Sequence, residues 1–136
     1  MVPEAVAPTK AHQTDAGFDL TAVSREFDML GNLVYHTGVA VEIPKGYVGL
    51  VFPRSSVCKK AQMLTNSVGV IDSGYRGEIT MKFKPQQSYG RHNNEYLVGE
   101  RIGQLLIIPY PEIEFEEVDE LGFGERGTNG YGSSGK

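Results

Sequence analysis

The chain has 136 residues, enough for one compact domain, and its single cysteine rules out an intrachain disulfide. Its 17 glycines and 7 prolines favour a turn-rich, all-β fold, because both residues are costly inside helices. Thirteen basic and seventeen acidic residues give a net charge of −4, with no basic run longer than two, which excludes a general nucleic-acid binder.

The sequence carries no sign of a membrane segment or a secretion signal. Its N-terminus lacks a charged region followed by an apolar one, and the longest aliphatic run, residues 105–108, cannot span a bilayer. We therefore expect a soluble protein that is not secreted and has no membrane partner. Its expected location is the cytoplasm, or the host-cell cytoplasm if the source is viral.

Short β-type runs separated by turn residues begin at Phe18. Residues 39–43, 47–52, 78–84 and 112–116 read as strands, and a short helix is expected near residues 55–63. In the third run, Ile79, Met81 and Phe83 alternate with polar residues, which is typical of a strand with one buried face. The spacing of these runs predicts a β-sandwich or barrel.

The last fifteen residues, 122–136, include six glycines and have almost no apolar face. We expect a β core over residues 1–121 and a mobile C-terminal arm over 122–136. A frayed tail is one reading of the arm. Another is a loop that closes on a phosphorylated ligand, because Arg126, Tyr131 and the serines supply guanidinium, stacking and hydroxyl groups.

Two internal segments could carry chemistry. Arg54 and Ser55 follow a predicted strand, and a Ser helix cap beside an Arg would form an anion site, although an ordinary cap with a solvated Arg is the default reading. Asp72 precedes a tight turn at Ser73-Gly74 between two expected hairpin strands. It serves either the turn or, beside a phosphate ester, as a base for water. The histidines lack zinc-site spacing, and Cys58 is expected to be buried.

Five segments together, DAGFDL, PRSS, GVIDSGYRGE, GERIGQLL and RGTNGYGSSG, resemble the five ordered motifs of the homotrimeric dUTPase family. The resemblance implies jelly-roll-like β subunits in a homotrimer, with each site at an interface and the arm of one subunit closing over another's. It also implies conversion of dUTP and water to dUMP and pyrophosphate, with Mg²⁺ on the triphosphate.

The resemblance assigns a role to each matching residue. Asp72 corresponds to the carboxylate that activates the attacking water, and Asp19 to a carboxylate that reaches the metal through water. The phosphate ligands correspond to Arg54, Ser55, Ser56, Gln104, Arg126, Ser133 and Ser134. The base and sugar contacts correspond to Asn66, Gly69, Ile71, Tyr75, Met81 and Tyr131.

Two alternatives to a dUTP diphosphatase follow from the same pattern. A dCTP deaminase shares the fold, but Lys82 stands where that family has a catalytic Glu, and an ammonium cannot replace that base. A non-catalytic dUTP-binding or regulatory protein with an unknown protein partner is the second. Production of dUMP and pyrophosphate would distinguish the diphosphatase from both.

Overall fold

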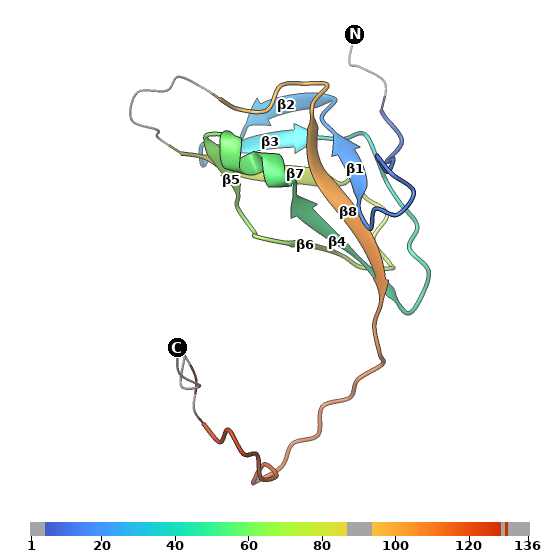
Figure 1. Cartoon of the computed structure of the whole chain (residues 1–136), viewed down its shortest axis with the longest axis vertical. Coiled ribbons are helices and arrows are strands. Elements are labelled where there is room, and N and C mark those ends of the chain that lie inside the picture. Colours follow the sequence, from blue (N-terminus) through green and yellow to red (C-terminus); the bar gives the residue numbers. More distant parts are fainter. Residues whose placement is uncertain (1–4, 87–93, 129, 131–136) are drawn as a thin grey trace.

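The computed structural model describes residues 5–86, 94–128 and 130, and it consists of two four-stranded antiparallel sheets (Figure 1). Sheet A has the strand order β1-β8-β4-β6, and sheet B the order β2-β3-β7-β5. The strands are β1 (Phe18–Thr21), β2 (Ser24–Phe27), β3 (Leu33–His36), β4 (Tyr47–Pro53), β5 (Gln62–Leu64), β6 (Gly69–Ile71), β7 (Thr80–Pro85) and β8 (Arg101–Pro109). The expected all-β, jelly-roll-like class is confirmed.

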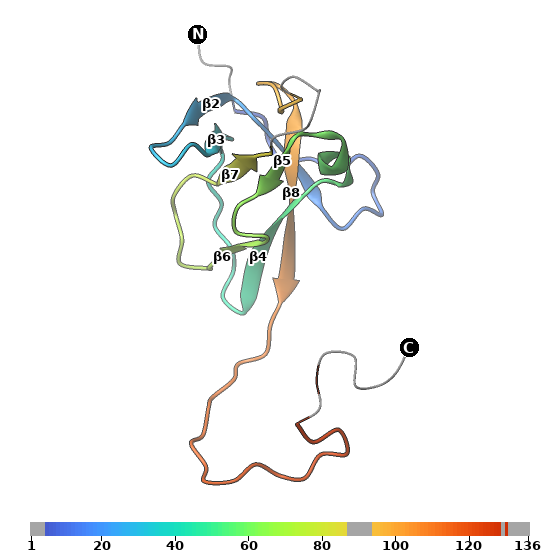
Figure 2. The same ribbon diagram turned by 90° about the vertical axis from the view of Figure 1, so that its left-hand side faces the viewer.

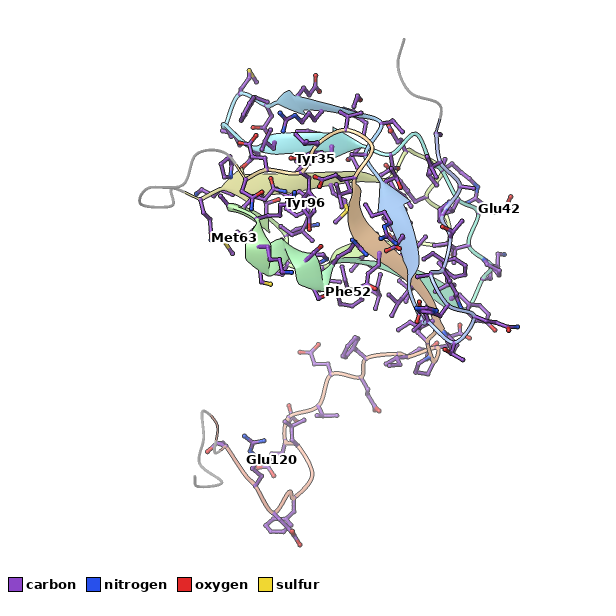
Figure 3. The ribbon with its side chains drawn as sticks, turned by 45° about the horizontal axis from the view of Figure 1, so that its top comes forward. Tyr35, Glu42, Phe52, Met63, Tyr96 and Glu120 are labelled. Carbon is purple, nitrogen blue, oxygen red and sulfur yellow. The ribbon has the colours of Figure 1, made fainter. Side chains whose placement is uncertain are left out.

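The hydrophobic core lies between the two sheets. Sheet A contributes Leu20, Val51 and Leu105, all at most 3% exposed. Sheet B contributes Tyr35 and Phe83, whose rings pack edge to face at a centroid distance of 5.6 Å. Figure 3 shows Tyr35 together with Tyr96 in this interior. Such buried aromatic contacts stabilise the sandwich beyond the area they remove from water.

Two of the predicted strands are confirmed with small shifts in their ends. Residues 47–52 form most of β4, and residues 80–84 lie in β7. Along the second run, Ile79, Met81 and Phe83 are 0–2% exposed, while Lys82 and Lys84 are exposed. The alternation in sequence therefore gave the correct buried face of β7.

Two other predicted strands are wrong. Residues 39–43 form no strand, although Val39 and Ile43 are buried; the preceding Gly38 has φ +67°, and the run ends at Pro44. Residues 112–116 also form no strand, and Phe115 is 100% exposed. Figure 2 shows the chain leaving the end of β8 and running away from both sheets. Alternation identifies a potential inner face but cannot supply the neighbouring strand.

The hairpin expected around Asp72 is not formed. β6 pairs with β4 in sheet A, whereas β7 pairs with β3 and β5 in sheet B, so residues 72–79 connect two sheets and do not close a hairpin. The expected helix is only a 3-10 turn, η1 (Ser55–Lys59), and Arg54 precedes it as the cap, with no side-chain cap bond. Cys58 is exposed, contrary to expectation, because η1 has no buried residue.

Within the described ranges, no helix is long and apolar enough to cross a membrane. The division into a core over residues 1–121 and an arm over residues 122–136 stays a prediction.

Candidate active site

One hollow in the surface, the Asp72 hollow, opens beside the connection from β6 to β7. It has a volume of about 250 Å³. Its walls combine one amide, one aromatic ring, two carboxylates and several apolar side chains, and its lining residues are Val51, Leu64, Asn66, Gly69, Val70, Ile71, Asp72, Tyr75, Glu78, Ile79, Thr80 and Met81. The structure thus brings together all the predicted base and sugar contacts that lie within the described residues.

A tight turn holds Asp72 at the edge of this hollow. The Tyr75 amide donates to the Asp72 carbonyl oxygen at 3.0 Å, which closes the turn predicted at Ser73-Gly74. The Arg76 guanidinium donates to the carbonyl oxygens of Ser73 at 2.7 Å and Tyr75 at 3.0 Å. These bonds fix the backbone on both sides of an exposed carboxylate, which is therefore presented to solvent and to any ligand.

Tyr75 lies against the backbone that follows it. Its hydroxyl donates to the Glu78 carbonyl oxygen at 3.0 Å. A Cβ added at Gly77 would come within 2.5 Å of the ring carbon Cζ, so only glycine leaves room for the ring there. The ring is half exposed and forms one wall of the hollow.

A second hollow, the Arg54 hollow, has a volume of about 510 Å³ and lies over β1, β4 and β8. Its lining residues are Ala11, Asp15, Ala16, Gly17, Asp19, Phe52, Arg54, Ser55, Gln104 and Leu106. A guanidinium, a hydroxyl and an amide that can donate hydrogen bonds make this surface suitable for phosphate oxygens.

Strand register brings the polar residues of the Arg54 hollow together. Asp19 of β1 and Phe52 of β4 both lie opposite Gln104 of β8, so the three side chains share one face of sheet A. The Gln104 amide donates to the Pro53 carbonyl oxygen at 3.3 Å. A Cβ at Gly17 would lie 2.5 Å from Gln104 Oε1, so this glycine leaves space for the glutamine.

Asp19 organises the positive charge of this hollow. Its Oδ1 accepts a hydrogen bond from Arg54 Nε at 3.0 Å, and its Oδ2 accepts one from Arg101 Nη1 at 2.9 Å. The Asp19 side chain is 15% exposed, whereas those of Arg54 and Arg101 are 27% and 50% exposed. The carboxylate holds two guanidinium groups that remain accessible to an anion.

The two hollows lie on opposite faces of sheet A. Val51 lines the Asp72 hollow, and the next residue of β4, Phe52, lines the Arg54 hollow. Successive side chains of a strand point to opposite faces. The hollows have no lining residue in common, so one copy of the chain does not place Asp72 and Arg54 in the same cavity.

The remaining predicted residues lie elsewhere. Ser56 lines neither hollow, and its hydroxyl is 3.4 Å from the Tyr96 hydroxyl. Arg126 lies in the exposed segment after β8 and also lines neither. Tyr131, Ser133 and Ser134 lie outside the described residues.

Sequence reasoning did not assign Asp15, Gly17 or Glu78 to a site. Gly17 is in the DAGFDL segment and Glu78 in GVIDSGYRGE, so their positions within these motifs could have identified them as site residues. Glu78 contacts His36 Nδ1 at 3.0 Å. This hydrogen bond holds the pKa of the Glu78 carboxyl below its usual 4.5 and raises that of His36 above 6.5. No signal in the sequence pointed to His36.

Comparison with known proteins agrees with this geometry. A family model described as dUTPase matches residues 3–135. The deoxyuridine 5'-triphosphate nucleotidohydrolase of Cutibacterium acnes is 41% identical over 98% of this chain and 88% of its own length. The enzyme of the same name from Escherichia phage T5 is 48% identical over 76% of this chain and 69% of its own length.

Solved structures give the same result. The dUTPase of Staphylococcus bacteriophage 80alpha with dUPNHPP is 32% identical and superposes with a TM-score of 0.77, covering 97% of this chain and 93% of that one. A mutant dUTPase from phage phi11 of S. aureus, described with a structural Mg(II) ion, is 29% identical and has a TM-score of 0.71 over 88% of this chain. The chain therefore belongs to the dUTPase family.

Proposed function

We propose that this dUTP diphosphatase uses Asp72 to activate the water that attacks the α-phosphorus of dUTP. The family fixes the overall reaction, in which dUTP and water yield dUMP and pyrophosphate. The observation that carries the residue assignment is the division of the described site residues between two complementary hollows. One presents a carboxylate beside a cavity for a base and sugar, and the other presents donors for phosphates.

In the chemical step, the Asp72 carboxylate accepts a proton from water as the water oxygen bonds to the α-phosphorus. The bond from that phosphorus to the oxygen bridging the α- and β-phosphates breaks, and pyrophosphate leaves with the electron pair. Such displacement depends mainly on in-line positioning and on stabilising the charge of the phosphoryl oxygens. The exposed, turn-held Asp72 is suited to orient a water against an entering phosphate.

The Asp72 hollow would hold the nucleoside. Asn66 supplies an amide that can both donate to and accept from a base, and Ile71 and Met81 supply apolar contacts. The Tyr75 ring would pack against the deoxyribose and exclude a 2′-hydroxyl. Gly69, on the same wall, lets the base approach the backbone closely.

The Arg54 hollow would hold the triphosphate. Arg54, Ser55 and Gln104 donate to its oxygens, and Arg101 adds positive charge from the side of Asp19. We assign Ser56, Arg126, Ser133 and Ser134 as further phosphate contacts and Tyr131 as a ring that stacks on the base. Closure of the C-terminal segment that carries Arg126, Tyr131, Ser133 and Ser134 would exclude bulk water from the site.

The residues fit a magnesium ion that enters with the triphosphate. Each Asp19 oxygen accepts one bond from an arginine and keeps a second lone-pair site, so it can accept from a metal-bound water. In the described residues, no group of three or more His, Cys, Asp or Glu could hold a metal. Mg²⁺ commonly keeps several waters and binds substrate phosphates, and it would neutralise part of their charge.

A homotrimer would unite the two hollows, with the Asp72 hollow of one copy facing the Arg54 hollow of another. An apolar surface beside the Arg54 hollow supports such contact: Val48, Leu50, Leu106 and Ile108 share the outer face of sheet A by register, and Ile108 is 39% exposed. Residues 112–116 also have strand-like alternation but no strand partner among the described residues of their own chain. A neighbouring copy can supply that partner.

The structure also weighs against a dCTP deaminase. Lys82, which stands at the position of that family's base, is not among the residues lining the Asp72 hollow. Its ammonium lies 3.6 Å from Asp28 Oδ2, on the exposed face of β7. The alternation of β7 turns this residue away while Met81 faces the hollow.

Product analysis with dUTP, dCTP or dTTP and Mg²⁺ tests the proposal, with Asp72→Asn as a second sample. We expect dUMP and pyrophosphate from dUTP alone, and loss of both products in the variant. Binding of dUTP without any product would instead indicate a nucleotide-responsive binding protein. Full activity in Asp72→Asn would remove Asp72 from the mechanism.

A further inference from the structure

We infer that Glu78 and His36 form a positioning pair that fixes the Tyr75 ring and so sets the discrimination between deoxyribonucleotides and ribonucleotides. The inference rests on the proposed contact of Tyr75 with the sugar. Neither Glu78 nor His36 has a part in the proposed chemical step. Neither is proposed to contact the reacting atoms.

The position of the Tyr75 ring depends on the backbone at residues 77 and 78. The ring contacts the chain on one side through Gly77, where no Cβ fits, and its hydroxyl donates to the Glu78 carbonyl oxygen at 3.0 Å. A ring that lies close to Gly77 and bonds through its hydroxyl to residue 78 depends on the position of both residues. If that backbone shifts, the wall that would face the sugar shifts with it.

Residue 78 is itself anchored by its side chain. The Glu78 side chain reaches across to the end of β3 and the residues that follow it. Its Oε1 accepts from the Gly38 amide at 2.7 Å, and its Oε2 lies 3.0 Å from His36 Nδ1. Both carboxylate oxygens are therefore used, and a charged acceptor makes such bonds stronger than neutral ones.

Backbone and hydroxyl bonds continue this attachment at the next residue. The Ile79 amide donates to the Val39 carbonyl oxygen at 2.8 Å, and the Thr37 hydroxyl donates to the Ile79 carbonyl oxygen at 2.6 Å. Because Ile79 is anchored independently of Glu78, loss of the Glu78 carboxylate should leave β7 in place. The change should therefore be confined to residues 75–78.

The charge of His36 links this pair to pH. Among the described residues, the titratable groups in contact with its ring are Glu26 of β2, with Oε1 at 3.6 Å from Nε2, and Glu78 at Nδ1. The imidazolium is thus placed between two carboxylates. Its loss of charge weakens its attraction for Glu78, so discrimination by Tyr75 should decline as pH rises through the pKa of His36.

The test compares kcat/KM for dUTP and for UTP in the full chain and in matched variants. Glu78→Ala removes both side-chain anchors, Glu78→Gln keeps an acceptor for the Gly38 amide, and His36→Gln removes the titrating group. Lys82→Gln is the control, because it neutralises another charged residue of sheet B, outside the hollow. Melting temperatures of all four variants report folding separately.

We expect Glu78→Ala to lower the ratio of kcat/KM for dUTP over UTP by about threefold to tenfold, the range for weakening the single hydrogen bond that holds Tyr75 to residue 78. Glu78→Gln should retain more of the ratio than Glu78→Ala, and Lys82→Gln should leave it unchanged. His36→Gln should lower the ratio at acidic pH and remove its pH dependence. If Glu78→Ala does not fold, Glu78→Gln and His36→Gln provide the same comparison.

An unchanged ratio in folded Glu78 and His36 variants, even with lower melting temperatures, would overturn the inference and leave the pair a role in stability alone. The positioning role can also be separated from the proposed function by two further results. If the unaltered protein fails to hydrolyse dUTP, the proposed function fails and the positioning role with it. If the unaltered protein cleaves dUTP but Tyr75→Phe keeps the full ratio, only the positioning role fails.

Discussion

Two stretches of this chain have the same alternating pattern and different structures. In residues 79–84, Ile79, Met81 and Phe83 are almost completely buried and β7 pairs with strands on both sides. In residues 112–116, Ile113 and Phe115 alternate with glutamates, yet they are 67% and 100% exposed. Figure 3 places Glu120, further along the same segment, away from both sheets. Alternation makes a strand only where a neighbouring strand is present to pair with it.

The largest expected difference between these stretches is in folding stability. Phe83→Ala removes a ring that packs against Tyr35 and Tyr96, and it should lower the free energy of unfolding by about 3–5 kcal/mol. Phe115→Ala at low protein concentration, where copies are dissociated, should change it by less than about 0.5 kcal/mol. Urea denaturation of both variants measures the two values. Equal losses in the free energy of unfolding would contradict the proposed difference between the two stretches.

Arg126→Ala should affect activity and spare the fold. If Arg126 donates to the phosphates as proposed, its removal should reduce kcat/KM for dUTP by about a hundredfold to a thousandfold. Arg126 lies in an exposed segment outside the sheets, so the melting temperature should stay within about 1 °C. Steady-state kinetics and thermal denaturation on the same preparation separate the effects. A large drop in melting temperature would mean that the segment supports the core.

Phe115→Asp tests whether a second copy supplies the missing neighbour of residues 112–116. Placing a charge where a partner buries the ring should weaken assembly by about 1.5–3 kcal/mol, the value of a buried Phe. Sedimentation at several concentrations should show trimers dissociating at higher concentration than for the unaltered protein. Glu116→Asp, which keeps the charge on the polar side of the pattern, is the matched control. Identical sedimentation of both variants would exclude a paired role for Phe115.

Gly103→Ala probes how closely β8 approaches the Asp72 hollow. A Cβ there would overlap the Met81 sulfur, so the flexible thioether must move, and Met81 lines the hollow. We expect KM for dUTP to rise by about twofold to tenfold with little change in kcat, since a small packing change of about 1 kcal/mol is involved. The double variant Gly103→Ala with Met81→Ala should recover part of this loss. A changed kcat at constant KM would disagree with a binding effect.

The smallest expected effect is the pH dependence of stability at the start of β7. The pKa of His36 is raised above 6.5, so its stabilising charge is complete below pH 6.5 and is lost as pH rises through the raised pKa. The pKa of Glu78 is lowered below 4.5, so its contribution is complete above pH 4.5 and is lost as pH falls through the lowered pKa. The melting-temperature difference between the unaltered protein and His36→Gln should therefore shrink on going to alkaline pH. A constant difference would contradict the pair.

Local chemistry made part of the fold and site predictable. The turn after Asp72 and the buried face of β7 depend on residues close in sequence, and both predictions were correct. The hairpin predicted between β6 and β7 was wrong, because the sheet that each strand joins depends on strands distant in sequence. The strands predicted at residues 39–43 and 112–116 were wrong for the same reason, since a strand needs a partner that the alternating pattern does not specify.

The arrangement of the candidate site could also be predicted only in part from the sequence. The motifs grouped Arg54, Ser55 and Gln104 as phosphate ligands, and these three side chains line one hollow. They did not reveal that the hollows occupy opposite faces of sheet A, because that depends on the alternation of β4 in the folded sheet. His36 reaches Glu78 only through the pairing of β3 with β7, which no local pattern encodes.

The most direct test of the central claim, that two copies together complete each site, is complementation between two inactive variants. Asp72→Asn damages one hollow and Arg54→Ala the other, and the two chains are refolded together in equal amounts. If each site combines hollows from two copies, random trimers should recover about a quarter of the unaltered activity, although neither variant is active alone. No recovery in preparations shown to contain mixed trimers would mean that each site lies within one chain.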